Sequence, residues 1–180
     1  MIGRGAARPS EIGARLQVPQ TQLSKTFEAL IDGGFLRRES PAGEKKRVHY
    51  IIQDAVLRFW FGVRQPHVTR WHAYSADQKM HVLRLFASGV FEQEWRGRYP
   101  GSKRHWEKGL EIDLLAPGVI AEVEFKSLTA GDRRRVEAEL RSKWKRSSLA
   151  KSSKPPEFLI LDYTAYTRTL KHERAKAHIG

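Results

Sequence analysis

The chain contains no cysteine. This absence excludes disulfide bonds, thiolate metal sites and cysteine nucleophiles. No apolar run approaches the roughly 18–20 residues that span a bilayer, and the beginning of the sequence lacks a hydrophobic stretch of signal-peptide length. There is also no Gly-rich loop ending in Gly-Lys-Ser or Gly-Lys-Thr, so we expect no ATP site of that kind. Together these absences predict a cytoplasmic protein with no membrane partner.

Charge is the most uneven feature of the composition. Thirty-three Lys and Arg stand against twenty Asp and Glu, a formal net charge of +13 over 180 residues. A small protein this basic usually binds a polyanion, most often nucleic acid, although a generally basic composition without such a partner is the alternative. Hydrophobic residues make up 40% of the chain, which is enough for a packed core. We therefore expect a folded protein whose partner is a nucleic acid.

The first fifty residues have the pattern of two helices followed by a hairpin. One helix starts at Pro9, and a second opens at Gln20 or Thr21. Gly33-Gly34 ends the second helix, as glycine beyond a helix terminus commonly does. Residues 35–51 then read as a strand, a polar turn and a basic second strand.

Two short helices followed by a two-stranded wing resemble the winged-helix family, and we assign residues 1–53 to such a domain. The resemblance implies that the second helix contacts base edges or phosphates and that the wing contacts the DNA backbone. The residues expected in these contacts are Gln20, Gln22, Ser24 and Lys25 on the helix, and Lys45, Lys46 and Arg47 on the wing. Because many winged helices pack against other domains, protein docking is the alternative.

Residues 54–76 are rich in aromatic side chains. Val56, Phe59, Trp60 and Val63 recur at helical spacing, which favours a helical linker that packs the two halves of the chain together. A platform on which nucleic-acid bases stack is the alternative.

The remaining residues, 77–180, predict an α/β (α+β) domain. The expected elements are a helix at 77–98, strands near 102–106, 110–116 and 119–126, a helix at 131–147, a strand at 157–162 and a basic helix at 165–178. The second and third strands form a hairpin around Ala116-Pro117-Gly118.

This hairpin carries several charged side chains. Alternation along its second strand places Glu122, Glu124 and Lys126 on one face. On its first strand the same rule puts Asp113 on the face of Glu111, and Ile112 on the face of Leu114. If the two polar faces coincide, Asp113 and Glu124 lie close together and repel each other. A divalent cation relieves such repulsion, and carboxylate oxygens suit Mg²⁺ or Mn²⁺.

The pattern Glu-Ile-Asp-Leu at 111–114 followed by Glu-x-Lys at 124–126 resembles the PD-(D/E)XK nuclease signature. It is similar to the form in Holliday-junction-resolvase-like proteins and in the carboxyl-terminal region of archaeal-type ATPases, whose ATPase module is absent here. The resemblance covers nearly the whole chain and implies a restriction-endonuclease-like α-β-β-β-α-β core. It also implies an acid on the preceding helix, where Glu92 stands, with Glu94 as the alternative. Ile112 stands where the family has proline.

These patterns predict a DNA-binding, metal-dependent endonuclease. Glu92, Asp113 and Glu124 would bind one or two Mg²⁺ or Mn²⁺ ions, and Lys126 would stabilise charge on the phosphate. The alternative is a catalytically inactive module with a nuclease fold that regulates by binding DNA or by docking to a protein. A separate ATPase or a second copy of the chain are the protein partners that the resemblance suggests.

Overall fold

The computed structural model describes residues 1–44, 46–107, 109–151 and 155–177, with side chains in the last helix described as far as Lys171. The protein belongs to the mixed α/β class and forms two compact units, Met1–Ala87 and Ser88–Gly180. Among the described residues, no helix combines the length and the apolar character that crossing a membrane requires.

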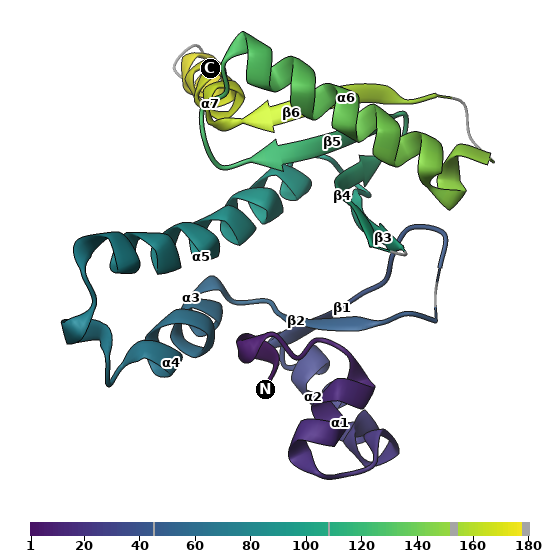
Figure 1. Ribbon diagram of the computed structural model, residues 1–180. Helices are drawn as coiled ribbons and strands as arrows, with labels where there is room; N and C mark the ends of the chain where they lie inside the picture. Colours follow the sequence, from purple (N-terminus) through teal and green to yellow (C-terminus); the bar gives the residue numbers. More distant parts are fainter. Residues whose placement is uncertain (45, 108, 152–154, 178–180) are drawn as a thin grey trace. The chain divides into compact units, whose positions relative to one another are not determined.

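The first unit begins with two helices and a hairpin (Figure 1). Its elements up to Ile52 are η1 (Ile2–Arg4), α1 (Pro9–Leu16), η2 (Gln20–Leu23), α2 (Ser24–Asp32), β1 (Leu36–Glu39) and β2 (His49–Ile52). The two strands pair antiparallel, and Ile12, Phe27, Leu36 and Ile52 are buried together beneath them. The predicted order of helix, helix, strand and strand is therefore confirmed, although the second helix opens as a 3₁₀ turn.

The segment that follows is helical but irregular. It contains α3 (Ala55–Phe59), a π-helical turn (Trp60–Arg64), α4 (Gln65–His67) and η4 (Trp71–Ala73). Val63 is buried, whereas Val56 and Trp60 are exposed within the described structure, so the predicted apolar face is not continuous. A π turn adds a residue to the helical repeat, and side chains on either side of it then no longer share a face.

The second unit is built on a mixed four-stranded sheet of order β3-β4-β5-β6. The elements are α5 (Ala76–Gly97), which enters from the first unit, β3 (Lys103–Glu107), β4 (Leu110–Ala116), β5 (Val119–Glu124), α6 (Ala130–Arg146), η5 (Ser148–Lys151), β6 (Glu157–Asp162) and α7 (Tyr163–Ala177). The first three strands are antiparallel, and β6 is parallel to β5. A parallel pair needs a long crossover, which α6 supplies. The predicted elements are all present, but β5 ends at Glu124.

Helices cover both faces of this sheet. On one face lies α6, which crosses β5 and β6 in Figure 1 and buries Val136, Leu140 and Trp144 against Ile112, Ile120 and Ile160. On the other face, Phe91 and Trp95 of α5 pack with Leu114, Ala121, Val123 and Leu161, and Tyr166 of α7 joins them. The apolar face predicted for Ala121 and Val123 is thus confirmed.

A β-bulge interrupts β4 at Asp113. Lys103 pairs with Leu115 and His105 pairs with Ile112, so two β4 residues lie opposite the single intervening residue of β3. As a consequence, Ile112 packs against α6 while Leu114 packs against α5. The prediction that Ile112 and Leu114 share a face is therefore wrong, because strict alternation applies only to a strand without a bulge.

Candidate acidic site

Asp113 lies where β4 and β5 stop pairing with each other. The ladder between these strands joins Leu114–Ala116 to Val119–Ala121 across a tight turn in which Gly118 has φ 74°. A positive φ of this kind is accessible to glycine, and the Pro117-Gly118 pair suits it. Beyond the ladder, the Asp113 side chain replaces a backbone partner, since its Oδ2 accepts a hydrogen bond of 2.9 Å from the Val123 amide.

Two glutamates from different elements feel the charge of Asp113. Burial, with repulsion by Asp113 next in size, raises the pKa of Glu92 on α5 from 4.5 to about 7. The same two causes, in the same order, raise the pKa of Glu122 on β5 to about 7. The pKa of Asp113 is itself raised, mainly by burial and further by Glu111, although the Val123 amide opposes the shift. We call Glu92, Asp113 and Glu122 the acid cluster.

Three cations lie around the acid cluster. Arg96 Nη1 is 3.7 Å from Glu92 Oε2 and donates a hydrogen bond of 3.2 Å to the Asp113 carbonyl. Lys143 Nζ on α6 is 2.5 Å from Glu122 Oε1. Arg104 pairs with Glu111. Burial lowers the pKa of Arg104, but Glu111, Glu92 and Asp113 more than offset this and raise it.

One oxygen of the acid cluster has no partner. Glu122 Oε2 is buried and makes no hydrogen bond within the described part of the chain. An unpaired buried carboxylate oxygen is costly unless a cation or another donor reaches it. In the described residues, no three His, Asp or Glu side chains stand close enough together to hold a metal ion as they are.

The structure brings together only part of the predicted catalytic set. Glu92 and Asp113 meet in the acid cluster, whereas Glu94 lies outside it, 48% exposed and paired with Arg98 at 3.1 Å. The pKa of Glu122 is raised by burial, then by Asp113, and to a smaller extent by Glu124. Glu124 itself pairs with Lys126 at 3.4 Å.

Lys126 lies beyond the end of β5. Its amide donates to the Glu124 carbonyl at 2.8 Å, and its carbonyl accepts from the Tyr163 amide at 3.1 Å, so the chain turns here. The side chain is 59% exposed. The pKa of Asp132 is lowered mainly by the Thr129 hydroxyl and by Arg135, and the charge of Lys126 lowers it further. Strand alternation therefore does not extend to Lys126.

The geometry of the hairpin turn predicts that Glu122 lies opposite Asp113. A two-residue turn at Pro117-Gly118 pairs Ala116 with Val119, and counting back along an antiparallel pair sets Asp113 opposite Glu122. The sequence pattern drew attention to Glu124 instead. The sequence indicates Lys143 less clearly, only through its position among the apolar residues of α6.

The described residues among those predicted to contact DNA are exposed in the first unit. Gln20 and Gln22 lie in η2, and Ser24 and Lys25 begin α2. In the hairpin loop, Lys46 and Arg47 are exposed, and Arg47 Nε is 3.2 Å from Glu44. The remaining predicted contact, Lys45, lies outside the described residues.

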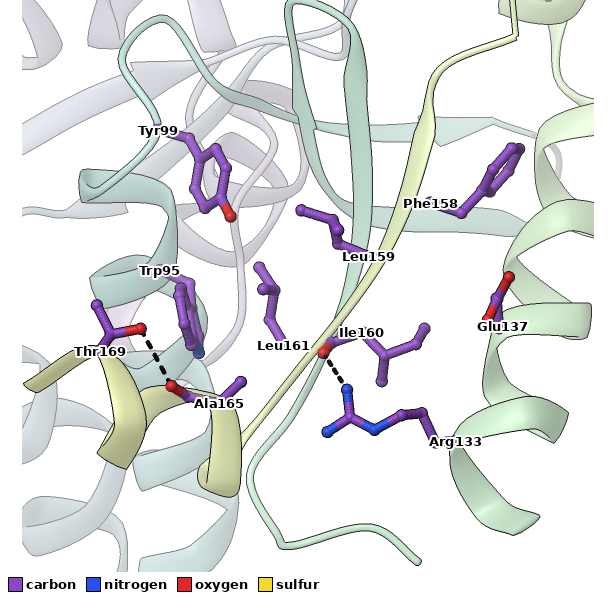
Figure 2. A pocket seen from close by; sticks show the side chains of 10 residues that line it. All are labelled: Trp95, Tyr99, Arg133, Glu137, Phe158, Leu159, Ile160, Leu161, Ala165 and Thr169. Carbon is purple, nitrogen blue, oxygen red and sulfur yellow. Dashed lines mark hydrogen bonds between the residues drawn. The ribbon is translucent and has the colours of Figure 1, made fainter. Parts of the chain in front are cut away.

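A pocket of about 380 Å³ runs along β6 (Figure 2). Trp95 and Tyr99 line one side of it, and Arg133 of α6 lines the other. Arg133 donates to the Ile160 carbonyl at 3.0 Å and to Asp162 Oδ2 at 2.6 Å. Arg133 thus ties α6 to β6, the last strand of the sheet in the described residues. No member of the acid cluster lines this pocket.

Comparison of the chain with models of known protein families, with curated proteins and with solved structures found no match.

Proposed function

We propose that the chain is a DNA-binding protein whose acid cluster supports Mg²⁺- or Mn²⁺-dependent hydrolysis of phosphodiester bonds. The observation that carries the proposal is the convergence of Glu92 and Glu122 on Asp113 at the point where β4 and β5 separate. The α-β-β-β-α-β order of the second unit supports it, since this is the order implied by the resemblance to PD-(D/E)XK nucleases.

The donor chemistry of the acid cluster fits a hard divalent cation. Carboxylate oxygens are the ligands that Mg²⁺ and Mn²⁺ prefer. Burial and, next in size, repulsion by Asp113 raise the pKa values of Glu92 and Glu122, so a bound cation would stabilise the ionised forms. The unpaired Oε2 of Glu122 offers a free ligand position. Since the three carboxylates do not surround a metal position as they stand, their side chains would have to rotate toward one another.

The proposed reaction is the attack of water on phosphorus. A bond forms between the water oxygen and phosphorus while the bond from phosphorus to the leaving sugar oxygen breaks; the water loses one proton, and the leaving oxygen gains one. When bound, a divalent ion supplies positive charge that stabilises the charge developing on the phosphate. The chain's own part is to hold the carboxylates, with Arg96 fixing Glu92 and the Val123 amide fixing Asp113.

In this proposal the first unit holds the DNA as a winged helix would. Exposed Gln20, Gln22, Ser24 and Lys25 face the grooves or phosphates, and Lys46 and Arg47 contact the backbone. The net charge of +13 favours such a partner.

Cleavage of labelled duplex, junction and single-stranded DNA in Mg²⁺ or Mn²⁺ tests the proposed activity. Asp113→Asn should lower the rate by about 100-fold or more, because it removes the carboxylate that both glutamates face. Glu94→Gln, a change on the same helix as Glu92 but outside the acid cluster, should leave the rate unchanged. A wild-type chain that cleaves none of these substrates in either metal would refute the proposal.

A second function is favoured by the cations around the acid cluster. Glu92 and Glu122 already have partners in Arg96 and Lys143, an arrangement that also suits a nuclease fold retained only for binding. Calorimetry distinguishes the two, since a binding module would show no Mn²⁺ uptake that depends on Asp113. A steep salt dependence of DNA affinity would then separate DNA binding from protein docking.

A further inference from the structure

Lys143 points into the acid cluster from the helix that covers the sheet. Its Nζ lies 2.5 Å from Glu122 Oε1, and the two side chains are only 24% and 17% exposed. Its positive charge also lowers the pKa of Asp113, against the larger effect of burial. The ammonium group therefore pairs with Glu122 and acts electrostatically on Asp113 as well.

The packing of α6 fixes this position. Val136, Leu140 and Trp144 are buried against the sheet, and Lys143 lies seven residues after the first of them and three after the second. Side chains at such spacings lie on one side of a helix. Because these three residues are buried against the sheet, Lys143 lies on the side of α6 that borders β5.

Lys126 has none of these features. It follows the end of β5, is 59% exposed and pairs with Glu124 rather than with a member of the acid cluster.

We propose that Lys143, and not Lys126, is the lysine that contacts the scissile phosphate, an inference that rests on the proposed nuclease function. As the water oxygen bonds to phosphorus and the bond to the leaving sugar oxygen breaks, negative charge grows on the phosphate oxygens. A partly buried ammonium next to the carboxylates stabilises that charge more than an exposed one does. Lys143 keeps its proton throughout, so the exchange of protons between water and leaving oxygen is unaltered.

The same geometry sets Lys143 in competition with a metal ion for Glu122. The ammonium occupies Oε1, and its charge repels any cation that approaches the cluster. Removing the charge should therefore strengthen binding of a metal ion and, at the same time, weaken cleavage. A lysine with a purely structural role would not produce these opposite effects.

The experiment compares Lys143→Gln, Lys143→Arg and Lys126→Gln in the full chain. Mn²⁺ affinity is measured by calorimetry without DNA, and cleavage of labelled DNA is measured at saturating Mn²⁺. For Lys143→Gln we expect Mn²⁺ to bind up to about tenfold more tightly and cleavage to slow by about 100-fold or more. Lys126→Gln should change both quantities by less than about twofold, because its charge is exposed.

Lys143→Arg keeps both the positive charge and a partner for Glu122, so it guards against a loss of activity caused by misfolding. We expect this variant to bind Mn²⁺ like the wild type and to cleave at a rate between those of the wild type and Lys143→Gln. Full cleavage by Lys143→Gln, weaker Mn²⁺ binding by it, or loss of cleavage in Lys126→Gln would each overturn the assignment of Lys143. A wild type that neither binds Mn²⁺ nor cleaves DNA would instead overturn the proposed function, and the assignment with it.

Discussion

Replacing Glu92 with glutamine should stabilise the metal-free protein at alkaline pH. The pKa of Glu92 is raised from 4.5 to about 7, chiefly by burial and next by Asp113, which means that the folded state holds the proton more tightly than the unfolded state does. At about 1.4 kcal/mol per unit, ionised Glu92 destabilises the fold by at most about 3.5 kcal/mol. Since its side chain is 21% exposed, we expect about 1–3 kcal/mol in practice.

The sign of the pH dependence follows from the raised pKa. The contribution of Glu92 to stability is fully present below its unfolded value of 4.5 and is lost as the pH rises through about 7. Glu92→Gln has no such proton to lose. The variant and the wild type should therefore be equally stable near pH 4.5, and the variant should be more stable above pH 7.

Amide hydrogen exchange in β4 and β5 is the suitable assay, because it reports on the second unit alone. Measurements in a chelator between about pH 5 and pH 8 are compared with Glu94→Gln, an exposed position on the same helix, which corrects for the intrinsic pH dependence of exchange. If Glu92→Gln shows no added protection at pH 8, or the same added protection at every pH, the reasoning is refuted. With Mn²⁺ at about 100 times its dissociation constant, the wild type should gain about 2.7 kcal/mol and the variant less.

Two further predictions concern the core and the DNA contacts. Leu140→Ala, at a fully buried position under the sheet, should lower the free energy of unfolding of the second unit by about 2–5 kcal/mol, measured by urea denaturation. The control is Ser142→Ala, at an exposed position of the same helix. A loss below about 1 kcal/mol for Leu140→Ala, or an equal loss for Ser142→Ala, would contradict the packing described. Changing Lys46 and Arg47 together to Gln should reduce the slope of log affinity for DNA against log salt by about two, and an unchanged slope would show that the hairpin loop does not contact phosphates.

Local patterns in the sequence determined the elements of this protein. Apolar spacing and turn residues determined α5, α6 and the four strands of the second unit, because helix and strand periodicity depend on near neighbours in the chain. Alternation along β5 likewise predicted correctly that Ala121 and Val123 face the core. The resemblance to the PD-(D/E)XK signature, rather than local periodicity, implied that Glu92 lies near Asp113, and Asp113 does raise the pKa of Glu92, second to burial.

The tertiary structure decided which other residues join these two. The bulge at Asp113 comes from the register between β3 and β4, and it reversed the face of Leu114 relative to Ile112. The turn after Glu124 ended the alternation that would have brought in Lys126. Lys143 reaches the cluster only because α6 docks on the sheet. Pairing register between β3 and β4 and helix docking depend on residues far apart in the chain, so local periodicity alone does not determine them.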